Sequence, residues 1–107
     1  MKISEYRKLI SDYLDGIILV EPFVIVYLHE FKTQPAGMDK KSFLILERLF
    51  ENIDAYSPSW TEKDEEEKPY RITEKTLKRE VKRAFKELES IGQKDDHDAS
   101  ADLSPKI

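Results

Sequence analysis

The chain has 107 residues, a formal net charge of −4, and 39% hydrophobic against 37% charged residues. This length suits one domain with a thin core, and the absence of cysteine excludes a disulfide scaffold, a thiolate metal site and a cysteine nucleophile. The slightly acidic balance argues against nucleic-acid binding by the domain as a whole. The longest apolar run, 17–28, is broken by Glu21 and Pro22 and is too short to span a bilayer. Because the charged N-terminus does not suit a secretory signal either, we expect a cytoplasmic protein.

Two helices are predicted in the first third of the chain. The first spans 4–14, with Ser4 as its N-cap and Gly16 after its end. The second segment, 17–32, is ambiguous, since its many β-branched residues also suit a strand. Pro22 fits the first turn of a helix, and Phe23, Tyr27 and Phe31 recur at helical spacing, which favours a helix over 21–32. Because it is apolar on most of its circumference, we expect it to be the most buried helix.

Two further helices follow. Asp39 is the predicted N-cap of a helix over 40–53, and Thr73 precedes a last helix that ends at Gly92. The apolar residues that recur at helical spacing along the last helix are Leu77, Val81, Ala84, Phe85, Leu88 and Ile91. We therefore predict an all-α fold, an antiparallel four-helix bundle with a long acidic connection, about 54–73, between the third and fourth helices. Residues 1–92 form the domain, and residues 93–107 are predicted to be a disordered C-terminal tail.

The acidic connection is the candidate functional site. From Glu47 to Glu67, eight acids against two bases give a local charge of −6. Loops of this length are uncommon in compact domains and are often functional. An acidic surface with aromatic side chains predicts the binding of a basic protein. The candidate partner-binding residues are Asp54, Tyr56, Trp60, Asp64, Glu65, Glu66 and Glu67, followed by Glu47 and Glu51 on the third helix.

Each of these features also has a simpler interpretation. The run 64–67, taken alone, is more often a solvated turn than a contact surface. Tyr56 and Tyr70 can instead pack the connection onto the bundle, and we favour this interpretation for Tyr70. For Trp60, packing onto the bundle and contact with a partner are equally plausible. The six bases of the last helix suit a solvated face, partly neutralised by acids at 74 and 80 that pair with bases at 78 and 83.

No enzyme, metal site or cofactor is expected. The two histidines, His29 and His97, have no partner at ligand or general-base spacing. The acidic run lacks the glycine and the regular spacing of a calcium-binding loop. Ser42 and Ser57 have no base positioned by any motif.

Three short motifs carry a family resemblance. They are Leu46-Glu47-Arg48-Leu49-Phe50, Asp54-Ala55-Tyr56-Ser57-Pro58, and Tyr70-Arg71-Ile72 followed by Leu77 and Glu80-Val81. Together they resemble the colicin D immunity protein family, which includes immunity proteins of contact-dependent inhibition systems. The similarity covers roughly 4–91. It implies a four-helix antitoxin that blocks the active site of a nuclease toxin with acidic side chains, and in the colicin D case that toxin cleaves transfer RNA.

The sequence thus predicts an immunity protein against a ribonuclease toxin, with a tRNase as the favoured target. Its expected partner is a basic nuclease domain, without direct binding of nucleic acid or membrane. One alternative is a non-enzymatic helical adaptor that binds another basic protein, and another is an RNA-binding module that uses the basic face of the last helix. The oligomeric state, the identity of the toxin and the mode of inhibition are left open by the sequence.

Overall fold

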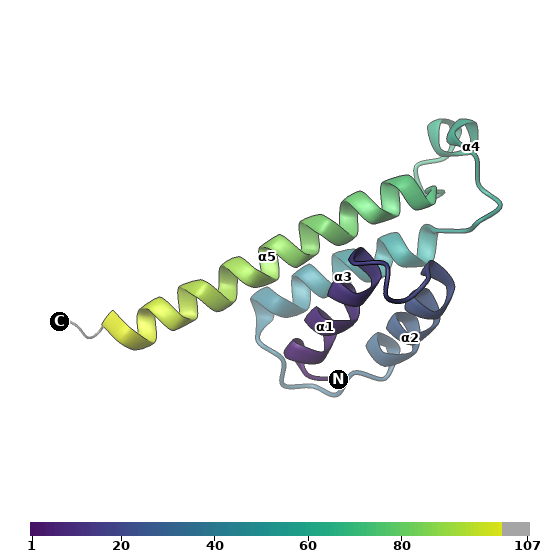
Figure 1. Cartoon of the computed structure of the whole chain (residues 1–107). Helices are drawn as coiled ribbons and strands as arrows, with labels where there is room; N and C mark the ends of the chain where they lie inside the picture. Colours follow the sequence, from purple (N-terminus) through teal and green to yellow (C-terminus); the bar gives the residue numbers. More distant parts are fainter. Residues whose placement is uncertain (102–107) are drawn as a thin grey trace.

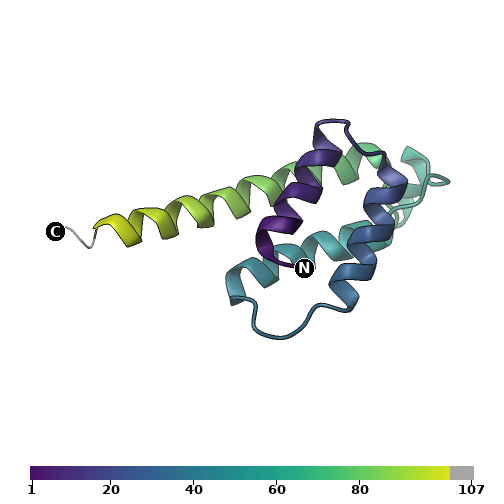
Figure 2. The same cartoon turned by 60° about the horizontal axis from the view of Figure 1, so that its bottom comes forward.

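The protein is built from helices. The computed structural model describes the backbone of residues 1–101 and the side chains of residues 1–91. Its five helices are α1 (Ile3–Leu14), α2 (Val20–Lys32), α3 (Lys40–Ala55), α4 (Glu62–Glu67) and α5 (Glu74–Ala101). Figure 1 and Figure 2 show α5 running beside α3 and past the end of the other helices. The all-α prediction is confirmed, and within residues 1–101 no helix is both long and apolar enough to cross a membrane.

The four longer helices enclose one hydrophobic core, as expected of a helical bundle. Helix α5 packs against α1 and α3, and α2 packs against the same two helices. Most of the buried apolar side chains recur at helical spacing, whereas Ile72 lies in the connection, and Phe31, Phe85 and Ile91 of the predicted patterns are only half-buried. The buried apolar side chains are Tyr6, Ile10, Tyr13, Phe23, Tyr27, Leu46, Leu49, Ile53, Ile72, Leu77, Val81, Ala84 and Leu88.

Local hydrogen bonds explain where the helices begin. The Asp39 carboxylate accepts from the Ser42 N–H at 3.0 Å, and the Thr73 hydroxyl accepts from the Thr76 N–H at 3.4 Å. Both predicted caps are therefore confirmed. Ser4 is not the cap of α1, because Lys2 occupies that position and its N–H donates to the Glu5 carboxylate at 2.6 Å.

Helix α2 confirms the helical interpretation of the ambiguous segment. The Tyr27 side chain is fully buried, and its hydroxyl donates to the Leu46 carbonyl oxygen at 2.8 Å, so its one polar group is satisfied. Burial raises the pKa of Tyr27. The prediction that α2 is the most buried helix is wrong, since Ile25 is 66% and Val26 38% exposed. Because α2 packs through one face only, Ile25 and Val26 face outward, while Val24 and Leu28 are half-buried beside the core.

Helix α5 continues past its predicted end. It runs to Ala101, nine residues beyond Gly92. A glycine inside a helix costs only about 1 kcal/mol relative to alanine, so Gly92 alone does not end it. Residues 102–107 lie outside the described residues, and the division into a domain over 1–92 and a tail over 93–107 stays a prediction.

The core can be tested with two leucines of α3. Leu46 is fully buried, whereas Leu44 is 50% exposed. We expect Leu46→Ala to lower the free energy of unfolding by about 2–5 kcal/mol through lost burial and a residual cavity. Leu44→Ala should change it by no more than about 0.5 kcal/mol. Urea unfolding followed by circular dichroism measures both, and equal effects would contradict the packing of α3.

Deletion of residues 93–107 tests the predicted tail. Among the described side chains of α5, which end at Ile91, the last buried one is Leu88, and Ile91 is half-buried. Because the sequence after Ile91 shows no apolar stripe, the shortened chain should melt at nearly the same temperature and bind its partner equally well. A large fall in either quantity would show that this segment belongs to the folded domain or to its interface.

Candidate partner-binding surface

The two ends of the connection between α3 and α5 are held together by the backbone. The Ile72 N–H donates to the Ala55 carbonyl oxygen at 3.2 Å, and Tyr56 forms an isolated backbone bridge with Ile72. The Ile72 side chain is 6% exposed and belongs to the core. Since the two ends lie side by side, the residues between them form a loop at the end of the molecule where α3 stops and α5 starts (Figure 1).

Trp60 and Arg71 pack together within this loop. The Trp60 indole Nε1 donates to the Ala55 carbonyl oxygen at 3.2 Å, and the Arg71 guanidinium carbon lies 4.5 Å from the centroid of the Trp60 ring. Arg71 also lies 3.9 Å from the Asp64 carboxylate. A cation–π contact at an exposed site contributes about 0.5–1 kcal/mol. These contacts hold the half-buried Trp60 in place inside the connection.

The acidic connection, which was predicted as a loop, contains the short helix α4 (Glu62–Glu67). Thr61 and Asp64 form a capping box at its start. The Asp64 carboxylate accepts from the Thr61 N–H at 2.9 Å, and the Thr61 hydroxyl accepts from the Asp64 N–H at 3.2 Å. The hydrogen bonds from Thr61, assisted by the charge of Arg71, hold the pKa of Asp64 below its usual range. The Thr-x-x-Asp spacing was the sequence signal for this helix.

Glu65 joins α4 to the start of α5. Its carboxylate accepts from the Thr73 N–H at 2.9 Å and from the Thr73 hydroxyl at 3.4 Å. The backbone hydrogen bond from Thr73 is the main reason that the pKa of Glu65 is lowered. Two of the predicted partner-binding acids, Asp64 and Glu65, therefore hold the connection together.

Five acids near this end of the molecule stay exposed, and they are called the exposed acids below. They are Glu51, Asp54, Glu62, Glu66 and Glu67. Within residues 1–91, none of them forms an ion pair. Glu47 is half-buried on α3. Glu62 was missed as a site residue, although it belongs to the same acidic run. The structure thus leaves these carboxylates uncompensated and accessible.

The two tyrosines of the connection behave differently from one another. Tyr56 is half-buried and packs against the core, and desolvation, with smaller effects of Glu74 and Glu21, raises its pKa. Tyr70 is 62% exposed, so the favoured prediction that it packs onto the bundle is wrong. Its ring centroid lies 5.8 Å from the Arg71 guanidinium carbon. An accessible aromatic ring therefore lies next to the folded acidic loop.

A helical bundle with a folded acidic loop at one end has the features of a small protein that binds a basic partner. The chain belongs to the family described as bacterial self-protective colicin-like immunity, which matches residues 1–88. No curated protein and no solved structure matches it. The resemblance found in the sequence is confirmed, and the chain is an immunity protein whose partner is a toxin.

The closure of the connection should depend on pH. In the folded protein the pKa values of Asp64 and Glu65 are lower than in the unfolded chain. Their stabilising contribution is therefore fully present above the ordinary carboxyl pKa values and is lost as the pH falls through the lowered ones. The fluorescence of Trp60, the one tryptophan of the chain, should report this acidic transition.

A pair of matched variants identifies the groups responsible. Glu65→Gln removes the negative charge of the side chain that accepts the hydrogen bond from Thr73, so the change in Trp60 fluorescence on acidification should become smaller. Glu66→Gln should leave this change as it is, because Glu66 is exposed. If both variants gave the same titration curve, the internal role of Glu65 would be wrong.

Proposed function

We propose that this immunity protein inhibits a ribonuclease toxin that cleaves transfer RNA. In this proposal the exposed acids enter the basic cleft of the toxin and take the places of RNA phosphates. The main support for this proposal is the group of five exposed carboxylates, which have no ion-pair partner within residues 1–91. A nuclease must hold a polyphosphate chain through positively charged groups, and an acidic surface is complementary to such a cleft.

The contacts within the connection support tight binding. Asp64, Glu65 and Trp60 are fixed by hydrogen bonds before any partner arrives. A surface that is already ordered loses less conformational entropy on association, so more of the interaction energy remains as affinity. The long-range attraction between opposite charges also raises the rate of association, which limits the time for which a free toxin is active.

Tyr70 is the aromatic anchor that we add to the predicted site. It is 62% exposed and lies beside Arg71, which itself stacks on Trp60. Tyrosine, tryptophan and arginine are the residue types that most often dominate interface energies. Inhibition is by stoichiometric binding, we propose in the cytoplasm, and it requires no catalytic residue.

Reversal of three exposed acids tests the surface. Asp54→Lys, Glu66→Lys and Glu67→Lys together should slow association with the toxin domain, weaken its salt dependence and abolish protection of cells that express the toxin. The fold should be retained, because all three side chains are exposed. For any one carboxylate that becomes desolvated against a toxin cation, the loss is about 2–5 kcal/mol. Stopped-flow association at several salt concentrations measures the effect.

The control makes the same change in net charge elsewhere. Glu5→Lys lies in the first turn of α1, and Glu87→Lys and Glu89→Lys lie near the last described side chains of α5, all away from the connection. This triple variant should bind and protect nearly as well as the unaltered protein. If both triple variants lost binding equally, net charge rather than this surface would control association. If the toxin did not cleave transfer RNA, the target would be wrong although the immunity function would stand.

A further inference from the structure

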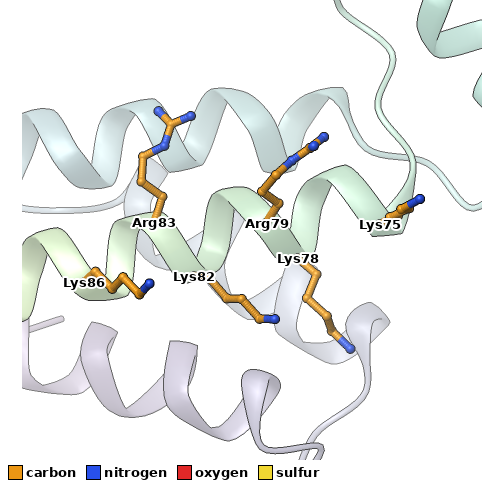
Figure 3. Close-up of a pocket in the computed structure, with 6 residues that line it drawn as sticks. All are labelled: Lys75, Lys78, Arg79, Lys82, Arg83 and Lys86. Carbon is orange, nitrogen blue, oxygen red and sulfur yellow. The ribbon is translucent and has the colours of Figure 1, made fainter.

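Helix α5 carries a second charged surface, which is called the basic trough below. It is formed by Lys75, Lys78, Arg79, Lys82, Arg83 and Lys86, whose side chains border a space of about 590 Å³ that is open to solvent. Figure 3 shows Arg79 and Arg83 pointing to one side of the helix and Lys78 and Lys82 to the other. The side chains thus form two rows, each with a spacing of four residues, or about 6 Å along the helix axis.

Acids of the same helix neutralise this surface only in part. The predicted pair of Glu80 with Arg83 is present at 2.9 Å. The predicted pair of Glu74 with Lys78 is absent among the described side chains, since Glu74 accepts a hydrogen bond from the Tyr13 hydroxyl at 3.0 Å instead.

The other cations of the trough lack a carboxylate partner within residues 1–91. Lys75, Lys82 and Lys86 are exposed. Arg79 donates to the Thr76 hydroxyl at 3.1 Å. Lys78 lies 5.5 Å from the centroid of the Tyr13 ring. Among the described side chains, ion pairing within the helix therefore accounts for one of the six cations, and Lys75, Lys82 and Lys86 have no ion-pair partner.

The chemistry of the lining indicates the kind of ligand. All six side chains are cations, with no aromatic ring to stack on a base and no amide to read a base edge. Phosphate groups are therefore the matching ligand. A nucleic-acid strand also releases condensed counterions when it binds several cations, whereas exposed ion pairs with an acidic protein contribute little.

The width of the trough favours one strand over two. Neighbouring residues of the two rows are one or three positions apart, and residues three positions apart on a helix have Cβ atoms about 5–6 Å from one another. We propose that the basic trough binds single-stranded RNA through its phosphates, without sequence preference. The expectation that the protein does not bind nucleic acid relied on the net charge of −4, which averages over this local surface. The proposal is independent of the toxin inhibition proposed above.

Fluorescence anisotropy with a short labelled oligouridine RNA tests the trough in the full chain. Each phosphate neutralised on a single strand contributes about −0.7 to the slope of log K against log salt. Engagement of about five cations therefore predicts a slope of about −3.5, or roughly a hundredfold loss of affinity between about 50 and 200 mM salt. A slope near zero would overturn the proposal.

Two triple variants with the same change in net charge locate the site. Lys75→Glu, Lys82→Glu and Lys86→Glu replace exposed side chains and should abolish most RNA binding, while the corresponding alanine variants should reduce the salt slope by about 2. Lys32→Glu, Lys40→Glu and Lys41→Glu change exposed residues outside the trough and should keep most of the affinity. Equal losses in the two glutamate variants would contradict a site on α5.

Competing ligands test the nature of the occupant. Unlabelled oligouridine should displace the probe, and duplex RNA of equal length and polyglutamate should do so much less effectively. If polyglutamate competed equally well, the trough would be a site for an acidic protein, and a clear preference for a DNA strand would also overturn the proposal. Protection against the toxin should persist in the trough variant, so the two proposals can fail separately.

Discussion

The carbonyl oxygen of Ala55 accepts hydrogen bonds from the Ile72 N–H and from the Trp60 indole, each at 3.2 Å. Ala55 is the last residue of α3, where carbonyl groups have no partner within their own helix. Both bonds therefore satisfy a group that the helix leaves unpaired, and they fold the connection back on its own start. The burial of Ile72 in the core attaches this arrangement to the bundle. The position of every carboxylate on α4 depends on this closure.

The acids of the connection consequently divide into two kinds. Asp64 and Glu65 form hydrogen bonds that order the loop, whereas their neighbours Glu66 and Glu67 are exposed. The net charge of −4 conceals a further division, because the trough on α5 is basic while the connection is acidic. Local charge, fixed by the fold, decides which ligand each surface attracts.

The sequence predicted the features that depend on neighbours within one helix. The aromatic spacing of α2 and the caps Asp39 and Thr73 came from periodicity and local hydrogen bonding. The contact between Glu65 and Thr73 could not be predicted, because it needs the closure of the connection to bring the two residues together. For the same reason the sequence grouped Glu65 with the exposed acids. The outward face of α2 was missed because periodicity does not show how many neighbours a helix has.

Amide hydrogen exchange of the immunity protein, alone and bound to its toxin domain, tests the central claim most directly. We predict that the toxin slows exchange in the last turn of α3 and through the connection, 51–72, and leaves α1 (Ile3–Leu14) unchanged. Slower exchange confined to α1 and α2, with the connection unaffected, would contradict the account and place the inhibitory surface on those two helices.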